Sequence, residues 1–240
     1  MALEQYQTYL LQPLIAILAV ITVFYTYKVL SKIDYNTLNV LKKAAHRVFF
    51  FLAIGMLLFA SAEIIFGMLS LLGYMTDVSI ADIFWTVGYF FLVAGYGLFA
   101  YTMHKLHGYK TKSKVVLGLV TVVSAAVVYY LILNYIVPAE SFAETFISYF
   151  YPIASTVVFI LAITVFFFLK HLDKMGKALF YLASFSVFDF IGNVLYTYVI
   201  GQNIYGLIGI LSDSSFVLSY VAMIMGLSLL LKSEIESFGD

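Results

Sequence analysis

Residues 115–137 read VVLGLVTVVSAAVVYYLILNYIV, an unbroken run without a single charged side chain. A helix needs about 20 mostly apolar residues to cross a hydrocarbon core about 30 Å thick, and this run reaches that length. Backbone groups in hydrocarbon must be satisfied within the segment or in a closed barrel. Because the apolar residues are continuous and do not alternate with polar ones, the run predicts a membrane-spanning helix.

Six further stretches of similar length and composition flank this one. The chain is 63% hydrophobic and 11% charged, whereas an ordinary globular chain is about half apolar and about a quarter charged. A soluble domain is therefore excluded. We expect an all-α membrane protein in which residues 1–240 form a single bundle of seven transmembrane helices. The predicted helices are approximately 9–29, 46–74, 80–104, 114–137, 142–170, 177–200 and 206–232.

The distribution of basic residues predicts the orientation of this bundle. All 13 Lys and Arg residues fall in alternate connectors or after the last helix, and short cytoplasmic loops carry such an excess. We therefore expect a multi-pass protein of the cell membrane with the N-terminus outside and the C-terminus inside. The first segment is preceded by Glu4 and no basic residue, so we expect it to be a retained helix and not a cleaved signal. The opposite connectors hold only the acids Glu4, Asp77, Glu140 and Glu144.

The basic inner face is a candidate surface for a cytoplasmic signalling partner. Because the net charge is zero, nothing indicates a nucleic-acid partner, and membrane lipids are the expected surroundings.

Two helix starts and one interruption can be predicted from side-chain chemistry. Ser79 with Asp82, and Ser141 with Glu144, have the spacing of a capping box, in which a serine and an acid satisfy the first backbone N–H groups. Pro152 lies inside the fifth segment and removes a backbone hydrogen bond. We expect a kink there and an interfacial turn before it.

Ionisable residues within a membrane span are costly, and they are candidates for functional residues. At about 1.5 Å per residue, Asp189 lies near the middle of its helix, whereas Glu63, Asp82 and Asp213 lie in the outer half. Polar and aromatic residues recur beside these acids at helical spacing, and converging stripes would form an aromatic and acidic cavity that opens outward. The candidate ligand-binding residues are Glu63, Asp82, Trp85, Tyr89, Tyr96, Asp189, Asn193, Tyr196, Asp213 and Tyr220.

Each acid also has a structural interpretation. Asp82 and Asp213 can cap the helices in which they lie, and Asp189 and Glu63 can form hydrogen bonds between helices. Both interpretations remain open at this stage.

The sequence does not favour an enzyme, a cofactor or a metal site. The chain has no cysteine, and it lacks a P-loop, a dinucleotide fingerprint and an H-E-x-x-H helix. His46, His104, His107 and His171 lie at the predicted inner ends of helices, where solvation is the simpler explanation. An aspartyl protease would need Asp189 and Asp213 within a few ångströms of each other, yet their depths differ by about 10 Å. We therefore expect no catalytic residues.

The overall topology is similar to that of the microbial rhodopsins. That family binds retinal through a lysine in the middle of the seventh helix, but residues 205–231 contain no lysine. A covalent retinal is therefore not expected, although the bundle shape is shared.

A second resemblance covers about 35 residues. Ala62-Glu63, the segment SIADIFW at 79–85 and the segment GYFFLVAG at 88–95 resemble the N-terminal membrane regions of prokaryotic histidine kinases and diguanylate cyclases. Phe90 stands where those regions commonly have proline, and no kinase or cyclase follows. The resemblance implies a sensing module that either stands alone or has its output in a separate chain.

From these features we expect a receptor-like, non-enzymatic sensor that binds a small ligand or lipid from outside and passes a helix rearrangement to the inner face. The alternative is a transporter or channel for a small solute, cation or proton. A transporter usually has two related halves with interrupted helices at matching places, and Pro152 has no such counterpart.

Overall fold

The computed structural model describes residues 10–33, 44–74, 78–136, 138–139, 141–169, 173–202 and 204–232. Over these residues the chain forms seven long helices, each long and apolar enough to cross a membrane, which confirms the helix count expected from the sequence. The helices are α2 (Gln12–Lys32), α3 (Ala44–Leu71), α4 (Ile80–His107), α5 (Thr111–Tyr135), α6 (Phe142–Phe168), α7 (Asp173–Gln202) and α8 (Gly206–Lys232).

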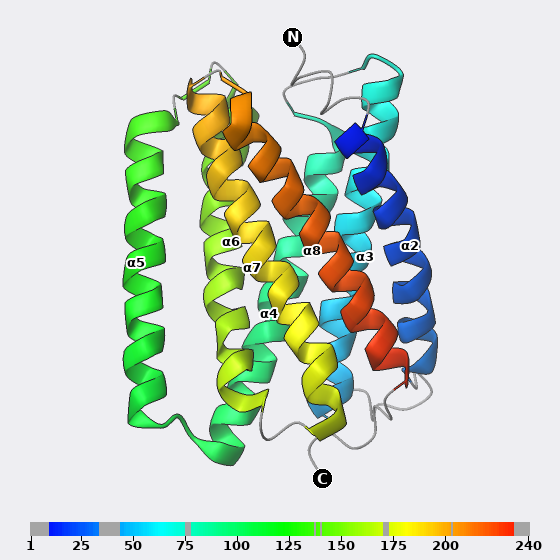
Figure 1. The fold of residues 1–240 in the computed structure, drawn as a ribbon, viewed down its shortest axis with the longest axis vertical. Helices are drawn as coiled ribbons and strands as arrows, with labels where there is room; N and C mark the ends of the chain where they lie inside the picture. Colours follow the sequence, from blue (N-terminus) through cyan, green and yellow to red (C-terminus); the bar gives the residue numbers. More distant parts are fainter. Residues whose placement is uncertain are drawn as a thin grey trace.

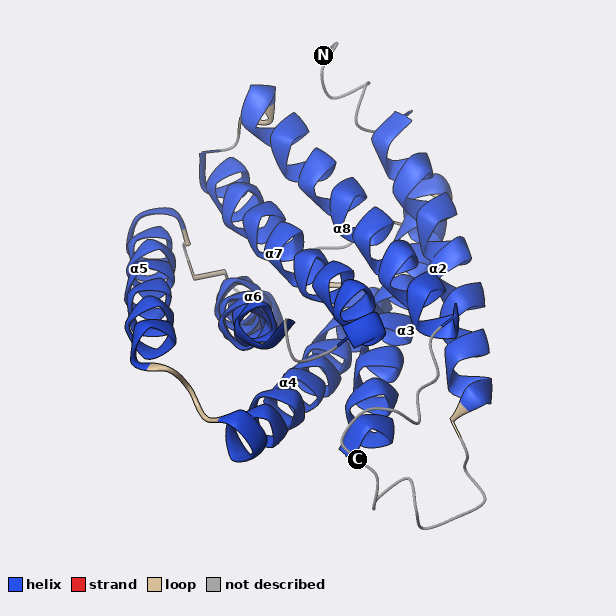
Figure 2. Cartoon of the chain, turned by 60° about the horizontal axis from the view of Figure 1, so that its bottom comes forward, coloured by secondary structure: helices blue, strands red, loops and turns tan. Residues whose placement is uncertain are grey.

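The helices run alternately up and down and form one bundle (Figure 1). The pairs α7 and α8, α3 and α4, and α2 and α3 pack most extensively, and α2 also packs on α8. Helix α6 lies among α4, α5 and α7, as its end-on view in Figure 2 shows. Helix α5 stands at the margin, where it packs on α6 and α7.

The alternation of the helices separates the charged residues along the bundle. We call the end where α2, α4, α6 and α8 finish the basic end, and the opposite end the acid end. The described basic residues all lie within the last or first two turns of helices at the basic end, or in the connection between α4 and α5. Lys42, Lys43, Lys170 and His171, and the acids Glu4, Asp77 and Glu140, lie outside the described residues.

Helices α3 and α4 approach each other closely because both have glycines at their contact. A Cβ placed on Gly55 would lie 3.1 Å from the carbonyl oxygen of Gly88, and one on Gly88 would lie 3.3 Å from that of Gly55. Small residues allow helix backbones to approach in this way within a membrane. Two turns further along α4, Gly95 faces the backbone of Leu52, so the close contact continues towards the basic end.

The predicted caps form at the acid end. The backbone N–H of Ser79 donates to Asp82 at 2.7 Å and the backbone N–H of Ala81 donates to the Ser79 hydroxyl at 3.2 Å, so α4 begins with the expected capping box. The Ser141 hydroxyl accepts from the backbone N–H of Glu144 at 3.3 Å and starts α6.

The turn expected before Pro152 was wrong. Helix α6 continues from Phe142 to Phe168 with Pro152 inside it. Proline removes only one hydrogen bond, and the hydroxyls of Ser155 and Thr156 donate to the Pro152 carbonyl at 3.3 and 2.6 Å, within the same helix. A proline is tolerated inside a membrane-spanning helix because neighbouring helices and Ser or Thr side chains can satisfy the freed backbone groups.

The core differs between the two ends. Towards the basic end it consists mainly of large apolar side chains that are fully buried, namely Phe49, Leu52, Phe99, Met103, Leu179 and Leu227. From the middle of the bundle to the acid end, tyrosines, acids and serines enter the interior. The polar half of the core is therefore where a functional site must be sought.

Candidate functional site: an acid and tyrosine cluster

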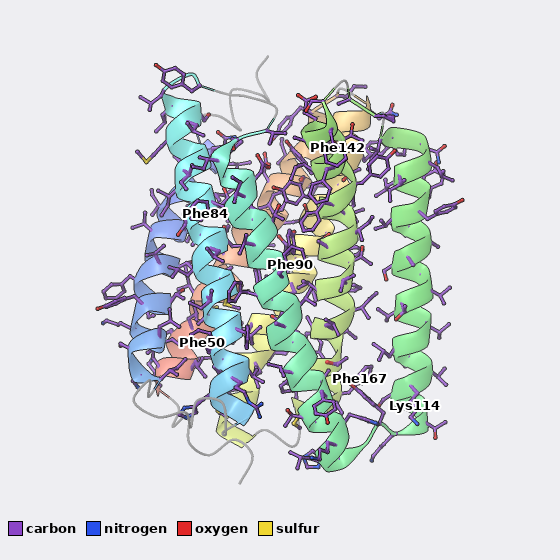
Figure 3. The ribbon with its side chains drawn as sticks, turned by 180° about the vertical axis from the view of Figure 1, so that it is seen from behind. Phe50, Phe84, Phe90, Lys114, Phe142 and Phe167 are labelled. Atoms are coloured by element: carbon purple, nitrogen blue, oxygen red, sulfur yellow. The ribbon has the colours of Figure 1, made fainter. Side chains whose placement is uncertain are left out.

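The inward face of α4 contains the residues that the sequence placed there. Asp82, Tyr89 and Tyr96 are buried, with exposed fractions of 9%, 2% and 0%, and Trp85 is half-buried. The outward face carries apolar residues such as Phe90, which lies on the α4 surface in the view of Figure 3. The predicted helical stripe is therefore confirmed as an interior face.

Tyr89 connects α4 to α7. Its hydroxyl donates to the Asp189 carboxyl at 3.0 Å. The amide of Asn193 donates to the Tyr89 hydroxyl at 3.1 Å and to the backbone carbonyl of Asp189 at 2.9 Å. Asp189 is 5% exposed, so its placement in the interior together with Asn193 agrees with the prediction from the sequence. The Asp189 carboxyl and the Asn193 amide therefore both bond to the Tyr89 hydroxyl across the boundary between α7 and α4.

Tyr96 makes a second connection between the same helices, two turns nearer the basic end. Its hydroxyl donates to the carbonyl oxygen of Leu182 in α7. The Ser186 hydroxyl, one turn along α7, donates to the Tyr96 oxygen at 3.1 Å. The α4 and α7 backbones are not among the extensively packed pairs, and these two tyrosine side chains connect them.

Asp82 belongs to both a helix cap and an interhelical contact. Its Oδ1 accepts a hydrogen bond from the Tyr151 hydroxyl of α6 at 2.6 Å, while Oδ2 accepts from Ser79. The Trp85 ring lies against this pair, with its centroid 6.2 Å from that of Tyr151 and 5.6 Å from that of Phe66 in α3. The structural interpretation of Asp82 is therefore confirmed, and the contact to Tyr151 adds a role between helices.

Glu63 lies half-buried on α3 and is the acid with the fewest compensating groups. The charged groups within electrostatic reach of its carboxyl are those of Asp189 and Asp213, both acids. The hydroxyls of Tyr151 and Tyr196 also lie within reach of Glu63. No hydrogen bond from a described residue to the Glu63 carboxyl is formed, so the interhelical bond that the sequence allowed for Glu63 is not seen within the described part of the chain.

Asp213 is buried near the start of α8, and the structure does not support the interpretation that it caps this helix. Helix α8 begins at Gly206, two turns before Asp213, so the acid lies within the helix. Its carboxyl accepts a hydrogen bond from the hydroxyl of Tyr205 in the preceding connection. The pKa of the Tyr205 phenol is raised above its ordinary value. Burial is the larger cause, and the hydrogen bond to Asp213 adds to it.

The two remaining candidates, Tyr220 and Tyr196, differ in burial. Tyr220 is 2% exposed and donates to the carbonyl of Phe59 at 3.2 Å, which joins α8 to α3. Tyr196 is 46% exposed, so it does not lie in the interior with Asp189 as expected. Tyr196 lies two turns further along α7, on the same side of the helix as Asp189 but nearer the acid end, where it remains within electrostatic reach of Asp82, Glu63 and Asp213.

The described side chains fill the middle of the bundle. Tyr89, Tyr96 and Tyr220 are almost completely buried, and their hydroxyls are hydrogen bonded. The acidic groups that lie nearer the acid end are those of Glu63, Asp82 and Asp213, beside the aromatic rings of Trp85, Tyr151 and Tyr196. We call these six residues the acid–tyrosine cluster.

The described residues bring no three His, Asp or Glu side chains close enough to hold a metal ion. His104 and His107 are exposed at the basic end, whereas His46 is 7% exposed at the start of α3.

Sequence reasoning missed two residues of this region, Tyr151 and Tyr205. Both donate hydrogen bonds to acids that the sequence had selected. The chain contains 20 tyrosines, and most membrane tyrosines lie at interfaces, so residue type gave no means of selecting these two. How close each of these tyrosines lies to a buried acid depends on how α6 and α8 pack.

Comparison with known proteins adds no relative: no protein-family model, no curated protein and no solved structure matches the chain.

Proposed function

We propose that the chain is a receptor-like, non-enzymatic membrane sensor that binds a small cationic ligand at the acid–tyrosine cluster. The observation that supports this proposal is the surroundings of the Glu63 carboxyl, which has the acids Asp189 and Asp213 within electrostatic reach. All described basic side chains lie at the other end of the helices. Like charges in a low-dielectric surrounding repel one another strongly, so a bound cation would stabilise the cluster.

The aromatic rings of the cluster fit the same class of ligand. Trp85, Tyr151 and Tyr196 lie beside the carboxyls, and a cation over the face of an aromatic ring is attracted by its quadrupole. A small quaternary or primary ammonium group would therefore find both carboxylates and ring faces. A neutral ligand of the same shape would find only the rings.

The proposed orientation has the acid end outside the cell and the basic end in the cytoplasm, as the positive-inside rule predicts. The protein would then be a multi-pass protein of the cell membrane. The ligand would enter from outside, where the cluster is nearest to water. The Lys-rich basic end would face a cytoplasmic signalling partner.

The tyrosine connections offer a route for the signal. A cation drawn to Glu63 and Asp213 alters the electrostatic surroundings of Asp189, which accepts from Tyr89. Any shift of α7 relative to α4 is then conveyed through Tyr89 and Tyr96, because these side chains bridge the two helices. The helices themselves extend the shift to the basic end.

The alternative function, transport of a solute, cation or proton, is supported less well. A transport path needs polar groups along the whole bundle, but the core nearest the basic end consists mainly of buried apolar side chains such as Phe49, Phe99 and Leu227. The hydroxyls of Thr26 and Thr164 in that half bond back to carbonyls of their own helices.

The chain provides its own probe for the experiment, because Trp85 is its only tryptophan. We would titrate the purified protein in nanodiscs with choline and with its neutral isostere 3,3-dimethyl-1-butanol, and record the Trp85 fluorescence. A saturable change with choline alone is expected. A response of equal size to the neutral isostere, or no saturable response to choline, would overturn the proposal.

Variants test the role of the carboxyls in the same assay. Glu63→Gln and Asp213→Asn should each weaken the choline response. Glu144→Gln removes a carboxyl from the same end of the bundle but outside the cluster, and it should leave the response unchanged.

A further inference from the structure

A hollow of about 170 Å³ lies at the basic end between the end of α4, the start of α5 and the end of α6. Its polar lining is His107, Lys110 and Ser113, and its apolar lining is formed mainly by Phe167 and Phe168. Since a water molecule occupies about 30 Å³ in the liquid, the hollow has room for a group with several oxygens. It lies at the opposite end of the bundle from the acid–tyrosine cluster.

The short connection between α4 and α5 is built so that the hollow is fixed in shape. Gly108 has a φ of 63°, a conformation that glycine adopts without strain, and its N–H donates to the His104 carbonyl at 2.9 Å to end α4. The Tyr109 ring stacks on His104 and packs on Phe168, both at centroid distances of 5.1 Å. Burial raises the pKa of the Tyr109 phenol. The connection is therefore held against α6 by Tyr109.

The charge at the hollow is positive. Lys110 directly precedes α5, and the first turn of α5 has no acidic residue and no side-chain cap. The N-terminal turn of a helix carries unsatisfied N–H groups and a partial positive charge, which adds to the charge of Lys110. Lys105, Lys112 and Lys114 belong to the same segment and are exposed. Figure 3 labels Lys114 and Phe167, which both lie at this end of the molecule.

The surroundings of the hollow are apolar on the side of α5 and α4. Leu106 is 56% exposed, Val115 58% and Leu119 61%. In a membrane these side chains contact acyl chains. A positively charged hollow next to such a surface combines a headgroup site with a place for hydrocarbon.

We propose that this hollow binds a phosphate group, and that the phosphate belongs to an anionic membrane lipid. Lys110 supplies the cationic group, the His107 ring and the Ser113 hydroxyl supply further polar contacts, and the acyl chains lie along the exposed apolar residues of α5. A free phosphate or phosphorylated metabolite has the same headgroup chemistry but nothing to place on Val115 and Leu119, so the lipid is the better match.

Native mass spectrometry of the purified full-length chain in detergent tests this site. Phosphatidylglycerol and phosphatidylcholine are titrated separately, and the lipid-bound fraction is measured. Phosphatidylglycerol is expected to bind more tightly, and Lys110→Gln to weaken it about fivefold, since one basic residue near an anionic lipid surface contributes about that factor. Equal binding of the two lipids would overturn the proposal.

Matched variants separate a site from diffuse charge. Lys177→Gln removes one exposed charge at the same end, on α7 and away from the hollow, and it should leave phosphatidylglycerol binding unchanged. An equal loss in Lys177→Gln and Lys110→Gln would overturn the site. Lys110→Arg keeps the charge and should retain phosphatidylglycerol binding. Ser113→Ala should weaken this binding, and it provides a second test if Lys110→Gln lowers the yield of folded protein.

Inorganic phosphate distinguishes the two sources of the headgroup. Millimolar phosphate is expected not to displace phosphatidylglycerol. Displacement that is lost in Lys110→Gln would support the phosphate site and overturn the lipid as its occupant. The choline assay reports on the other end of the bundle, so failure of the lipid experiment and failure of the proposed function can be told apart.

Discussion

The Tyr89 hydroxyl and the Asp189 carboxyl form a hydrogen bond of 3.0 Å in the middle of the bundle, across a separation of 100 residues in the chain. Their helices, α4 and α7, are not among the pairs that pack extensively. The side chain of Tyr89 is long enough to cross that distance. A membrane interior without water gives the hydroxyl few other partners, so this contact specifies how α4 and α7 face each other.

The first prediction concerns the acceptor in this hydrogen bond. Asp189→Asn retains an oxygen that can accept from Tyr89, so the unfolding midpoint in detergent should change little. Asp189→Leu removes the acceptor and should cost about 1 kcal/mol. Choline binding should weaken in Asp189→Asn because a negative charge near Glu63 is lost.

A double-mutant cycle identifies the pair itself. Tyr89→Phe combined with Asp189→Leu should give a coupling energy of about 0.6 kcal/mol or more. Strictly additive effects would show that the two residues do not act together.

The second prediction compares two glycines of α4. A Cβ on Gly95 would lie 2.7 Å from the Leu52 side chain and 3.0 Å from its backbone nitrogen, whereas one on Gly97 would meet no atom within 4 Å. Gly95→Ala should therefore destabilise the bundle by about 1–3 kcal/mol, as overpacked cores do. Gly97→Ala is the control and should show no loss. The thermal unfolding midpoints of both variants test this prediction. Equal midpoints would contradict it.

The third prediction concerns the start of α4. Ser79→Ala removes the acceptor for the Ala81 N–H and should cost about 1 kcal/mol of stability. The control is Ser184→Ala, because the Ser184 hydroxyl only bonds back to the Phe180 carbonyl of its own helix. Denaturant titration should give Ser79→Ala a clearly lower free energy of unfolding than Ser184→Ala. The reverse order would contradict a stabilising cap.

The fourth prediction tests the orientation in the membrane. The chain has no cysteine, so single cysteines can be introduced without background. Tyr74→Cys at the acid end should react with an impermeant thiol reagent added to intact cells, and Lys112→Cys at the basic end only after the cells are opened. The opposite labelling pattern would reverse the proposed topology and the side from which the ligand enters.

The fifth prediction concerns retinal. Because residues 205–231 contain no lysine, incubation of the purified protein with retinal followed by borohydride should produce no adduct within residues 205–231. Peptide mapping by mass spectrometry gives the readout. An adduct on the interior of the bundle would require a different helix assignment.

The sequence by itself predicted the parts of the fold that depend on local patterns. Runs such as residues 115–137 are long and apolar, and the lack of water forces each of them into a helix. The cap formed by Ser79 and Asp82 also depends only on neighbours in the chain, and it was confirmed. The inward face of α4 followed from the spacing of Asp82, Tyr89 and Tyr96, since a helix repeats every 3.6 residues.

Contacts between helices could not be predicted in this way, because apolar residues in lipid gain nothing by choosing one helix neighbour over another. Tertiary packing alone decided that Tyr151 donates to Asp82 and that Tyr205 donates to Asp213. It also placed Tyr196 at the edge of the bundle and Glu63 near two other acids. Packing volume and a few hydrogen bonds select the helix neighbours, and these quantities exist only once α4, α6, α7 and α8 are assembled.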